Sequence, residues 1–176
     1  MDFRDDKIPK RLAILTRLTT LLETIQPSRG YQFDLKGKVF RGRELFGDEL
    51  DMPALTLLEA PTGGMNIPAN LERTVNAGDW TVFVQGMVKD NKQTPVDEVY
   101  WLHADVVRCL STVTAMDAKQ QPVSPATYRL GGLIDDLTLT PAVCRPPEAG
   151  VSSKAFFWMP IIIKYTLDNT NPYHYR

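Results

Sequence analysis

The stretch GKVFRGRELFGDELDMPALTLLEAP, residues 37 to 61, holds the densest mixture of side chains that could do chemistry. Arginine near aromatic rings is typical of nucleic-acid surfaces. Clustered carboxylates can bind a cation or act as a general base. The first question is therefore which of these chemistries, if any, the stretch performs.

Arg41 and Arg43 are two residues apart in an expected strand, so they share one face of it and Phe40 and Gly42 share the other. Acidic residues follow closely in the sequence, and they would repel the phosphates of a DNA groove. Arginine and aromatic residues are enriched in protein interfaces, where ion pairs help to set the register of the partners. We therefore interpret Arg41, Arg43 and Phe46 as candidate subunit-interface residues.

The other residues that could act in catalysis or metal binding are isolated from one another. His103 lies on or beside an apolar helical stripe, which indicates a core or interface histidine. Asp135 and Asp136 are adjacent in an expected strand and point to opposite faces, so they cannot readily chelate one metal ion. Cys109 and Cys144 lack histidine companions at zinc-site spacing. We expect no enzyme, no catalytic or metal-binding residue and no cofactor.

The composition is that of a folded protein with balanced charge. The 176 residues fit one domain, with 43% hydrophobic and 23% charged residues. Twenty basic and 21 acidic residues leave a net charge of -1, which weakens the case for a free-standing nucleic-acid binder. The first residues lack a signal-peptide core, and no run approaches the roughly 20 apolar residues of a membrane span. We expect a protein made in the cytoplasm, with no membrane partner.

Two segments have helical periodicity. Apolar residues recur at steps of four and three from residue 8 to residue 25, which predicts the first helix. The second helix is expected from Pro95 to about Val113, with Thr94 as its N-cap. The stripe of the first helix is Ile8, Leu12, Leu15, Leu18, Leu22 and Ile25.

The rest of the chain reads as strands and loops. Strands are expected at residues 38–42, 53–60, 80–89, 133–143 and 154–167, and residues 144–153 could form a hairpin tip. The order α-β-β-β-α-β-β predicts an α+β fold, with a mixed or mainly antiparallel sheet of about five strands and both helices on one face.

The predicted organisation is one domain, residues 1–168, followed by a C-terminal tail, residues 169–176. Residues 61–79 are rich in proline, glycine and asparagine and predict a long loop. The tail carries Tyr173 and Tyr175, which are further candidate subunit-interface residues because interfaces favour aromatic groups. We expect the loop and the tail to be mobile or protruding in the free subunit and ordered after assembly.

Several phrases resemble a known family when they are taken in order along the chain. After an opening helix come GYQFDLKGKVFRGRELFGDE, MPALTLLEAP, DWTVFVQGMV, YWLHADVVRCL and RPPEAGVSSKAFFWMPIIIKY. Together they resemble the tail terminator or tail completion proteins of tailed bacteriophages, over most of residues 8 to 167. The phrases that carry the resemblance most are RGRELFGD, LLEAP and FVQG.

The resemblance implies a small α+β subunit that assembles into a ring, often a hexamer, at the head-proximal end of the tail tube. There it stops tube growth and presents a surface to the neck proteins. Its implied partners are copies of itself, the tail tube protein and neck or head-completion proteins, with DNA only passing through the ring lumen. The protein would be assembled in the host cytoplasm and reside in the virion, and the family has no catalytic residues to carry over.

Three alternatives remain at this point, and the one with least support is an enzyme of unrecognised chemistry. Head-completion and other neck-ring proteins share the size and folds of tail terminators. The second alternative, a DNA-binding accessory protein, has its support in a set of basic residues, namely Lys7, Lys10, Arg11, Arg17, Arg41 and Arg43.

Overall fold

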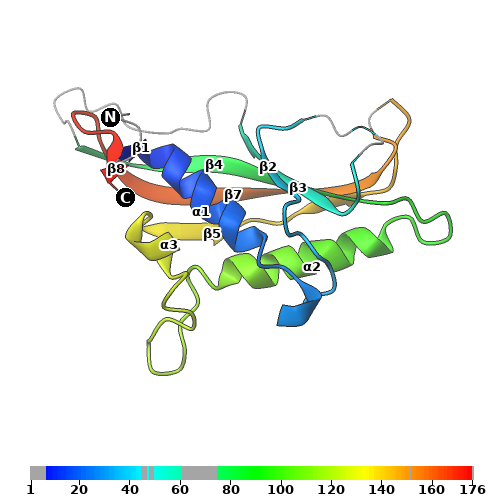
Figure 1. The fold of residues 1–176 in the computed structure, drawn as a ribbon, viewed down its shortest axis with the longest axis horizontal. Helices are drawn as coiled ribbons and strands as arrows, with labels where there is room; N and C mark the ends of the chain where they lie inside the picture. The colour runs from blue at the N-terminus through cyan, green and yellow to red at the C-terminus, as the bar shows by residue number, and fades with distance from the viewer. Residues whose placement is uncertain (1–6, 45–46, 48–49, 61–74, 151, 176) are drawn as a thin grey trace.

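The chain folds as a mixed sheet with helices packed on one face, which confirms the predicted α+β class (Figure 1). The computed structural model describes residues 7–44, 47, 50–60, 75–150 and 152–175. In chain order the elements are β1 (Lys7–Pro9), α1 (Lys10–Leu22), the 3₁₀ helix η1 (Pro27–Arg29), β2 (Val39–Arg41), β3 (Ala54–Glu59), β4 (Val75–Val88), α2 (Asp97–Ser111), α3 (Arg129–Gly132), β5 (Asp136–Leu139), β6 (Val143–Arg145), β7 (Ala155–Asp168) and β8 (Tyr173–Tyr175).

The main sheet has six strands, in the order β2-β3-β4-β7-β5, with β6 also paired to β7. β2 runs parallel to β3, and the other neighbours are antiparallel. β4 and β7 are the longest strands, at 14 residues each, and they pair along their whole length. A separate two-stranded sheet joins β1 to β8, near the two chain ends in Figure 1.

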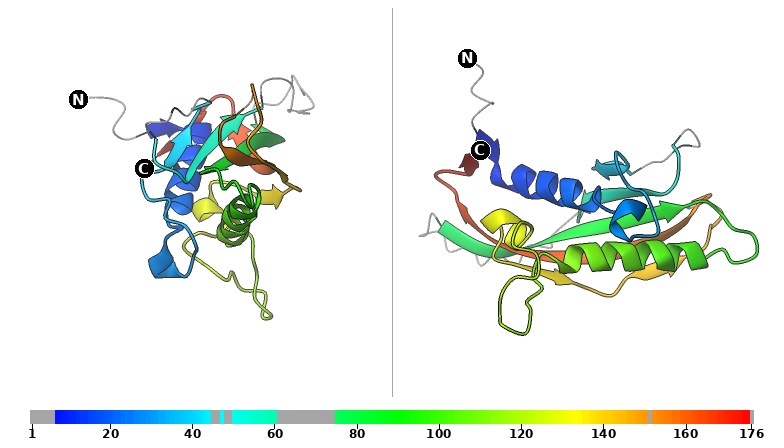
Figure 2. Two further views of the ribbon diagram at one scale, coloured as in Figure 1. Left: turned by 90° about the vertical axis from the view of Figure 1, so that its right-hand side faces the viewer. Right: turned by 60° about the horizontal axis from the view of Figure 1, so that its bottom comes forward.

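The core lies between the sheet and the helices α1 and α2, which Figure 2 shows on one side of the sheet. Alternate residues of β7 are buried against the helices because successive side chains of a strand point to opposite faces. Burying each large apolar side chain contributes about 1.5–3 kcal/mol. The buried set from β7 is Ala155, Phe157, Met159, Ile161, Ile163 and Tyr165.

The first helix begins later than predicted, and its buried stripe shares Leu18 and Leu22 with the predicted one, while the predicted Ile25 is buried just after the helix. It starts at Lys10, and the residues before it form β1, because Ile8 precedes Pro9 and the residue before a proline is pushed toward extended backbone. Leu12 is 43% exposed and was wrongly placed on the buried stripe. The leucine-rich helix offers two overlapping apolar stripes, and the core takes Ala13, Ile14, Leu18, Leu21 and Leu22.

The second helix confirms the prediction in position but not in its N-cap. α2 buries Val99, Leu102 and Val106 as expected. Its N-cap residue is Val96, without a side-chain cap bond, so the Thr94 prediction is wrong. The Thr94 hydroxyl instead accepts a hydrogen bond from the Asn91 side-chain amide at 3.1 Å.

Three predicted segments change their limits. β4 starts at Val75, so the last residues of the predicted 61–79 loop belong to a strand, and residues 61–74 lie outside the described part. The single strand predicted at 133–143 is two strands, β5 and β6, separated around Pro141, which lacks a backbone donor. The hairpin predicted at 144–153 is confirmed, since β6 and β7 are antiparallel neighbours on either side of it.

Gly86 in β4 is closely surrounded by core side chains. A Cβ atom there would overlap the Phe157 ring and lie 2.9 Å from Leu55 Cδ2. We expect Gly86→Ala to lower the free energy of unfolding by about 1–3 kcal/mol, because overpacking forces neighbours off their rotamers. Urea unfolding measures this loss. In a Phe157→Leu background the same glycine change should cost less, and an equal cost in both backgrounds would contradict the steric explanation.

Candidate interaction surfaces

The two arginines of the opening stretch do not share a face. β2 ends at Arg41, and Gly42 follows with φ +70°, a left-handed conformation that glycine adopts readily. The chain therefore turns, and the Arg43 guanidinium lies 5.0 Å from the centre of the Phe40 ring. The shared-face prediction is wrong because it assumed a strand that continues through Gly42. Phe46 lies outside the described residues.

Arg41 connects the edge of the sheet to the first helix. Its guanidinium donates a hydrogen bond to Thr19 Oγ1 of α1 at 3.2 Å, and that hydroxyl donates to the Leu15 carbonyl at 2.8 Å. Arg41 remains exposed at the residue level. It can therefore contact a neighbour only while it also supports the packing of β2 against α1.

The predicted C-terminal tail is a paired strand rather than a free extension. β8 pairs antiparallel with β1, with Tyr175 opposite Lys7 and Tyr173 opposite Pro9. The Lys7 ammonium lies 4.6 Å from the centre of the Tyr173 ring, and Tyr173 is 41% exposed. Sequence patterning misses this pairing because the two strands are short and come from opposite ends of the chain.

We call the β1–β8 pair, residues 7–9 and 173–175, the terminal ribbon. It is attached to the main fold at the start of α1. The Lys10 backbone amide donates to the Pro172 carbonyl at 2.9 Å, and the Lys10 ammonium donates to the Thr166 carbonyl at 2.7 Å. The first amides of a helix lack helical partners, so the tail carbonyl satisfies one of them. About nine residues of α1, or roughly 14 Å of helix, separate Lys10 from Thr19 at the Arg41 site. Of the predicted interface residues, Arg41 and Tyr173 therefore lie near opposite ends of α1 and do not form one cluster.

Asp105 is a buried acid that sequence reasoning did not single out. It lies on α2 at 6% exposure and accepts hydrogen bonds from the backbone amides of Gln32 (2.8 Å) and Phe33 (3.1 Å). Arg108, one turn further, donates to the Gly30 carbonyl at 2.7 Å and stacks 4.8 Å from the Tyr31 ring centre. These contacts hold the segment after α1 against α2. An acid next to the apolar stripe was the signal that could have revealed this anchor.

His103 packs between α2 and the sheet, as the sequence indicated. Its ring contacts the Phe157 ring edge-on, with 5.3 Å between centroids. Its Nε2 atom is buried and has no hydrogen-bond partner among the described residues. Burial lowers the pKa of His103 below its ordinary value of 6.5 because the charged form loses solvation. The arrangement suits a neutral packing histidine.

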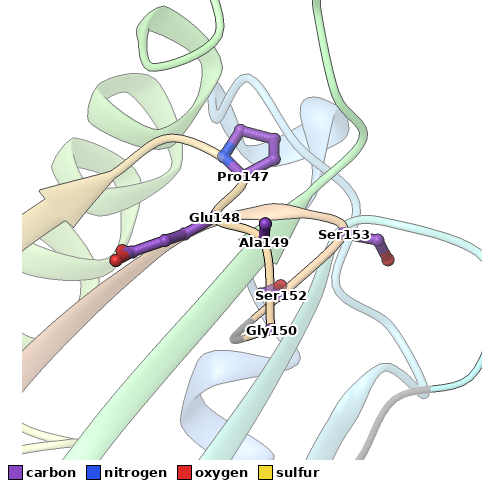
Figure 3. Close-up of a pocket in the computed structure, with 6 residues that line it drawn as sticks. All are labelled: Pro147, Glu148, Ala149, Gly150, Ser152 and Ser153. Carbon is purple, nitrogen blue, oxygen red and sulfur yellow. The ribbon is translucent and has the colours of Figure 1, made fainter.

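Among the hollows on the described surface are three that no histidine or cysteine lines, and one of them lies between α1 and residues 126–130. Another is at the tip of the β6–β7 hairpin, where Figure 3 shows Glu148 and Ser153 directed to opposite sides. Its only ionisable lining residue among those described, Glu148, is paired with Arg145 at 2.9 Å. The third lies between the Met52–Pro53 turn and residues 88–92, beside Asp51, whose pKa is lowered by a hydrogen bond from Lys38.

The sheet face opposite the helices carries an apolar surface that the described residues leave partly open. Cross-strand neighbours on this face are Leu58, Phe83 and Pro160 in one row and Gln85, Trp158 and Val143 in the next. Trp158 is 44% exposed and Val143 is 60% exposed. The Phe83 and Trp158 rings are in contact, with centroids 5.7 Å apart.

The same sheet face ends in charged residues. Lys164 of β7 lies between Asp79 of β4 and Asp136 of β5 in the strand register. At the opposite end a small cluster of Met52, Ala54, Met87 and Phe156 covers the face. The open part is thus an aromatic and aliphatic patch with a polar border, which is the composition of a protein interface. We call Phe83, Val143, Trp158 and Pro160 the open-face patch.

The comparisons with known proteins add no relative. No protein-family model matches the chain, and no curated protein matches it. No three His, Cys, Asp or Glu side chains within the described ranges lie close enough to bind a metal ion together. None of the described helices is long and apolar enough to cross a membrane.

The terminal ribbon generates a prediction about local stability. Deleting residues 173–176 removes β8 and frees β1, so we expect faster hydrogen exchange at the first amides of α1. The loss of the ribbon should also lower the free energy of unfolding by about 1–3 kcal/mol, since each net hydrogen bond contributes about 0.5–1.5 kcal/mol. Tyr173→Ala is the matched control, because it removes the ring but keeps the backbone pairing. Unchanged exchange in the deletion variant would contradict the role of the ribbon.

His103 generates a prediction about pH. Its folded pKa is depressed, so the unfolded chain binds the proton more readily than the folded protein does. The stability that the neutral ring contributes is complete above pH 6.5 and is lost as the pH falls from there toward the folded pKa. Urea unfolding at pH 7.5 and 5.5 should show a smaller loss in His103→Phe than in the wild type. His174→Gln, at an exposed position, should behave like the wild type.

Proposed function

We propose that this chain is a structural subunit of a phage virion that forms a ring at the head-proximal end of the tail. In this role it ends the tail tube and presents a surface to the neck proteins. Its partners are copies of itself, the tail tube protein and neck or head-completion proteins. The ring of the family that the chain resembles is often a hexamer. DNA only passes through the lumen.

The observation that carries the proposal is the open-face patch. The described part of the chain exposes an aromatic surface on the sheet. Enzymes typically have instead a pocket that is lined by reactive groups. Trp158 and Phe83 are the residue types that contribute most to protein interfaces. Two phrases of the family resemblance reach this patch, since Phe83 of FVQG belongs to it and Leu58 of LLEAP is the cross-strand neighbour of Phe83. The resemblance and the surface therefore support the same kind of function.

Most of the basic residues that supported DNA binding make contacts within the fold, namely Lys7, Lys10, Arg11, Arg41 and Arg43. Lys10 and Arg41 donate the hydrogen bonds described above. Arg11 donates to the Tyr165 hydroxyl at 2.7 Å and lies 4.9 Å from the centre of the Trp80 ring. A phosphate would have to compete with these contacts. This favours the ring subunit over the DNA-binding alternative.

The test is the loss of self-association when the patch is truncated. We expect Trp158→Ala to weaken ring formation by about 30-fold or more, since a central aromatic anchor is worth about 2 kcal/mol or more. The monomer should keep its fold, because Trp158 lies outside the buried core. Val123→Ala is the matched control, since Val123 is 58% exposed but lies on the loop after α2. Native mass spectrometry on purified protein and on assembled tails measures the rings.

Two results would overturn the proposal. The first is a ring that forms equally well with Trp158→Ala and with the control. The second is submicromolar binding to duplex DNA at about 0.15 M salt with a steep salt dependence, which would favour the DNA-binding alternative.

A further inference from the structure

The outer side of α2 exposes two large aromatic residues in succession. Tyr100 is 59% exposed and Trp101 is 58% exposed, although both lie in the middle of a well-formed helix. The helix already buries a full apolar stripe against the sheet. These two rings are therefore not needed for the core, and α2 itself packs on the face of the sheet opposite the open-face patch (Figure 2).

The exposed residues of α2 form a stripe of their own. Asp97, Trp101, Ala104 and Arg108 follow one another at steps of four, three and four, so they lie on one side of the helix. All four are exposed. The buried residues Val99, Leu102, Val106 and Leu110 occupy the opposite side. We call Asp97, Trp101, Ala104 and Arg108 the outer stripe.

The charges and side-chain sizes along the outer stripe are complementary to those of a second stripe that runs in the opposite direction. Asp97 is the first residue of α2, and Arg108 lies 11 residues later, about 16 Å along the helix. The large Trp101 and the small Ala104 are placed symmetrically between them. When a second copy of the stripe is laid antiparallel, each Asp97 meets an Arg108 and each Trp101 meets an Ala104.

A parallel arrangement lacks this complementarity. It would set Asp97 beside Asp97 and Arg108 beside Arg108, which is repulsive. It would also bring the two bulky Trp101 rings together and the two small Ala104 side chains together. Antiparallel helices in addition oppose their dipoles favourably. The pattern therefore fits one particular occupant, the same helix in reverse direction.

We propose that the outer stripe of α2 binds the outer stripe of a second copy of this chain in an antiparallel, two-fold contact. Arg108 can take part while it holds the Gly30 carbonyl, because a guanidinium has five N–H donors. Exposed Ala104 permits the close approach that packed helices need. The contact is isologous, so it joins two copies and closes.

This inference goes beyond the proposed ring and does not depend on it. A ring requires a contact between different surfaces of adjacent copies, whereas the α2 pair uses one surface twice. The outer stripe and the open-face patch lie on opposite sides of the sheet, so both contacts can exist together. In a ring, the α2 pair would join one ring to another. In the free protein, it would give a dimer.

The experiment is a charge-reversal exchange. Asp97→Arg and Arg108→Asp are prepared separately, and each is examined by sedimentation velocity at low and moderate salt. Each variant alone would place like charges at both ends of the pair, so self-association should weaken at least tenfold. A one-to-one mixture should restore dimers, because both contacts in the mixed pair are then Arg with Asp. Lys119→Asp, an exposed charge reversal away from α2, is the control.

A second variant keeps the test decisive if Arg108→Asp disturbs the Gly30 contact and fails to fold. Ala104→Lys places a bulky charge at the centre of the outer stripe, where the side chain is exposed, and should abolish the dimer with the melting temperature unchanged. Dimers that persist in Asp97→Arg and Ala104→Lys would overturn the inference. A wild-type protein that stays monomeric at the highest protein concentration that sedimentation velocity allows would also overturn it. So would folded single variants that fail to form dimers when they are mixed.

The two proposals fail separately. Trp158→Ala should leave the α2 pair intact, and Ala104→Lys should leave ring formation by the open-face patch intact. If Trp158→Ala loses the dimer and Ala104→Lys keeps it, the two-fold contact lies on the sheet face. That result would overturn the α2 inference and leave the ring proposal standing.

Discussion

The pairing of β4 with β7 is the constraint on which the rest of the fold depends. The two strands meet along 14 residue pairs, and β3, β5 and β6 are each attached to one of them. Gly86 lies opposite Phe157 in this ladder, and the absence of a side chain at Gly86 leaves room for the ring. The same ring contacts His103 on α2. One register of two strands thus positions the sheet neighbours and the second helix together, and a slip of one residue would move the side chains of the slipped strand to the opposite face.

The ladder also explains why the molecule has one closed and one open side. Alternation along β7 sends Phe157, Met159 and Ile161 to the helices and leaves Trp158 and Pro160 on the other face. The helices supply one layer only, so they seal one face. Polar anchors complete that layer, with Asp105 holding the segment after α1 and Lys10 holding the chain end. The surfaces available for binding are a consequence of this single-sided packing.

Local patterns were sufficient for the fold class and for most elements, and they failed where a distant partner decides the structure. The apolar alternation of β7 and the helical stripe of α2 are visible in the sequence because burial imposes them directly. The pairing of β8 with β1 is not, since backbone hydrogen bonds between opposite chain ends leave no periodic signal. The prediction that Arg43 shares a strand face with Arg41 failed at Gly42. A left-handed glycine ends the strand there without changing the apolar pattern of the sequence. Of the interaction surfaces, sequence reasoning named Arg41 and Tyr173 but not Trp158, whose exposure becomes clear only when the helices are seen to cover the other face.

The two exposed surfaces differ most in whether they are complementary to a second copy of themselves. The open-face patch is apolar, and its two ends differ, with Asp79, Lys164 and Asp136 at one end and the cluster of Met52, Ala54, Met87 and Phe156 at the other. Such a surface is suited to a different partner surface, which is the requirement for a ring or for stacking on a tube. The outer stripe of α2 has an acid at one end, a base at the other and a large and a small residue between them, so it is complementary to its own reverse. A chain that carries one surface of each kind on opposite sides can extend around a ring with the first and close a pair with the second, without either contact competing for the other.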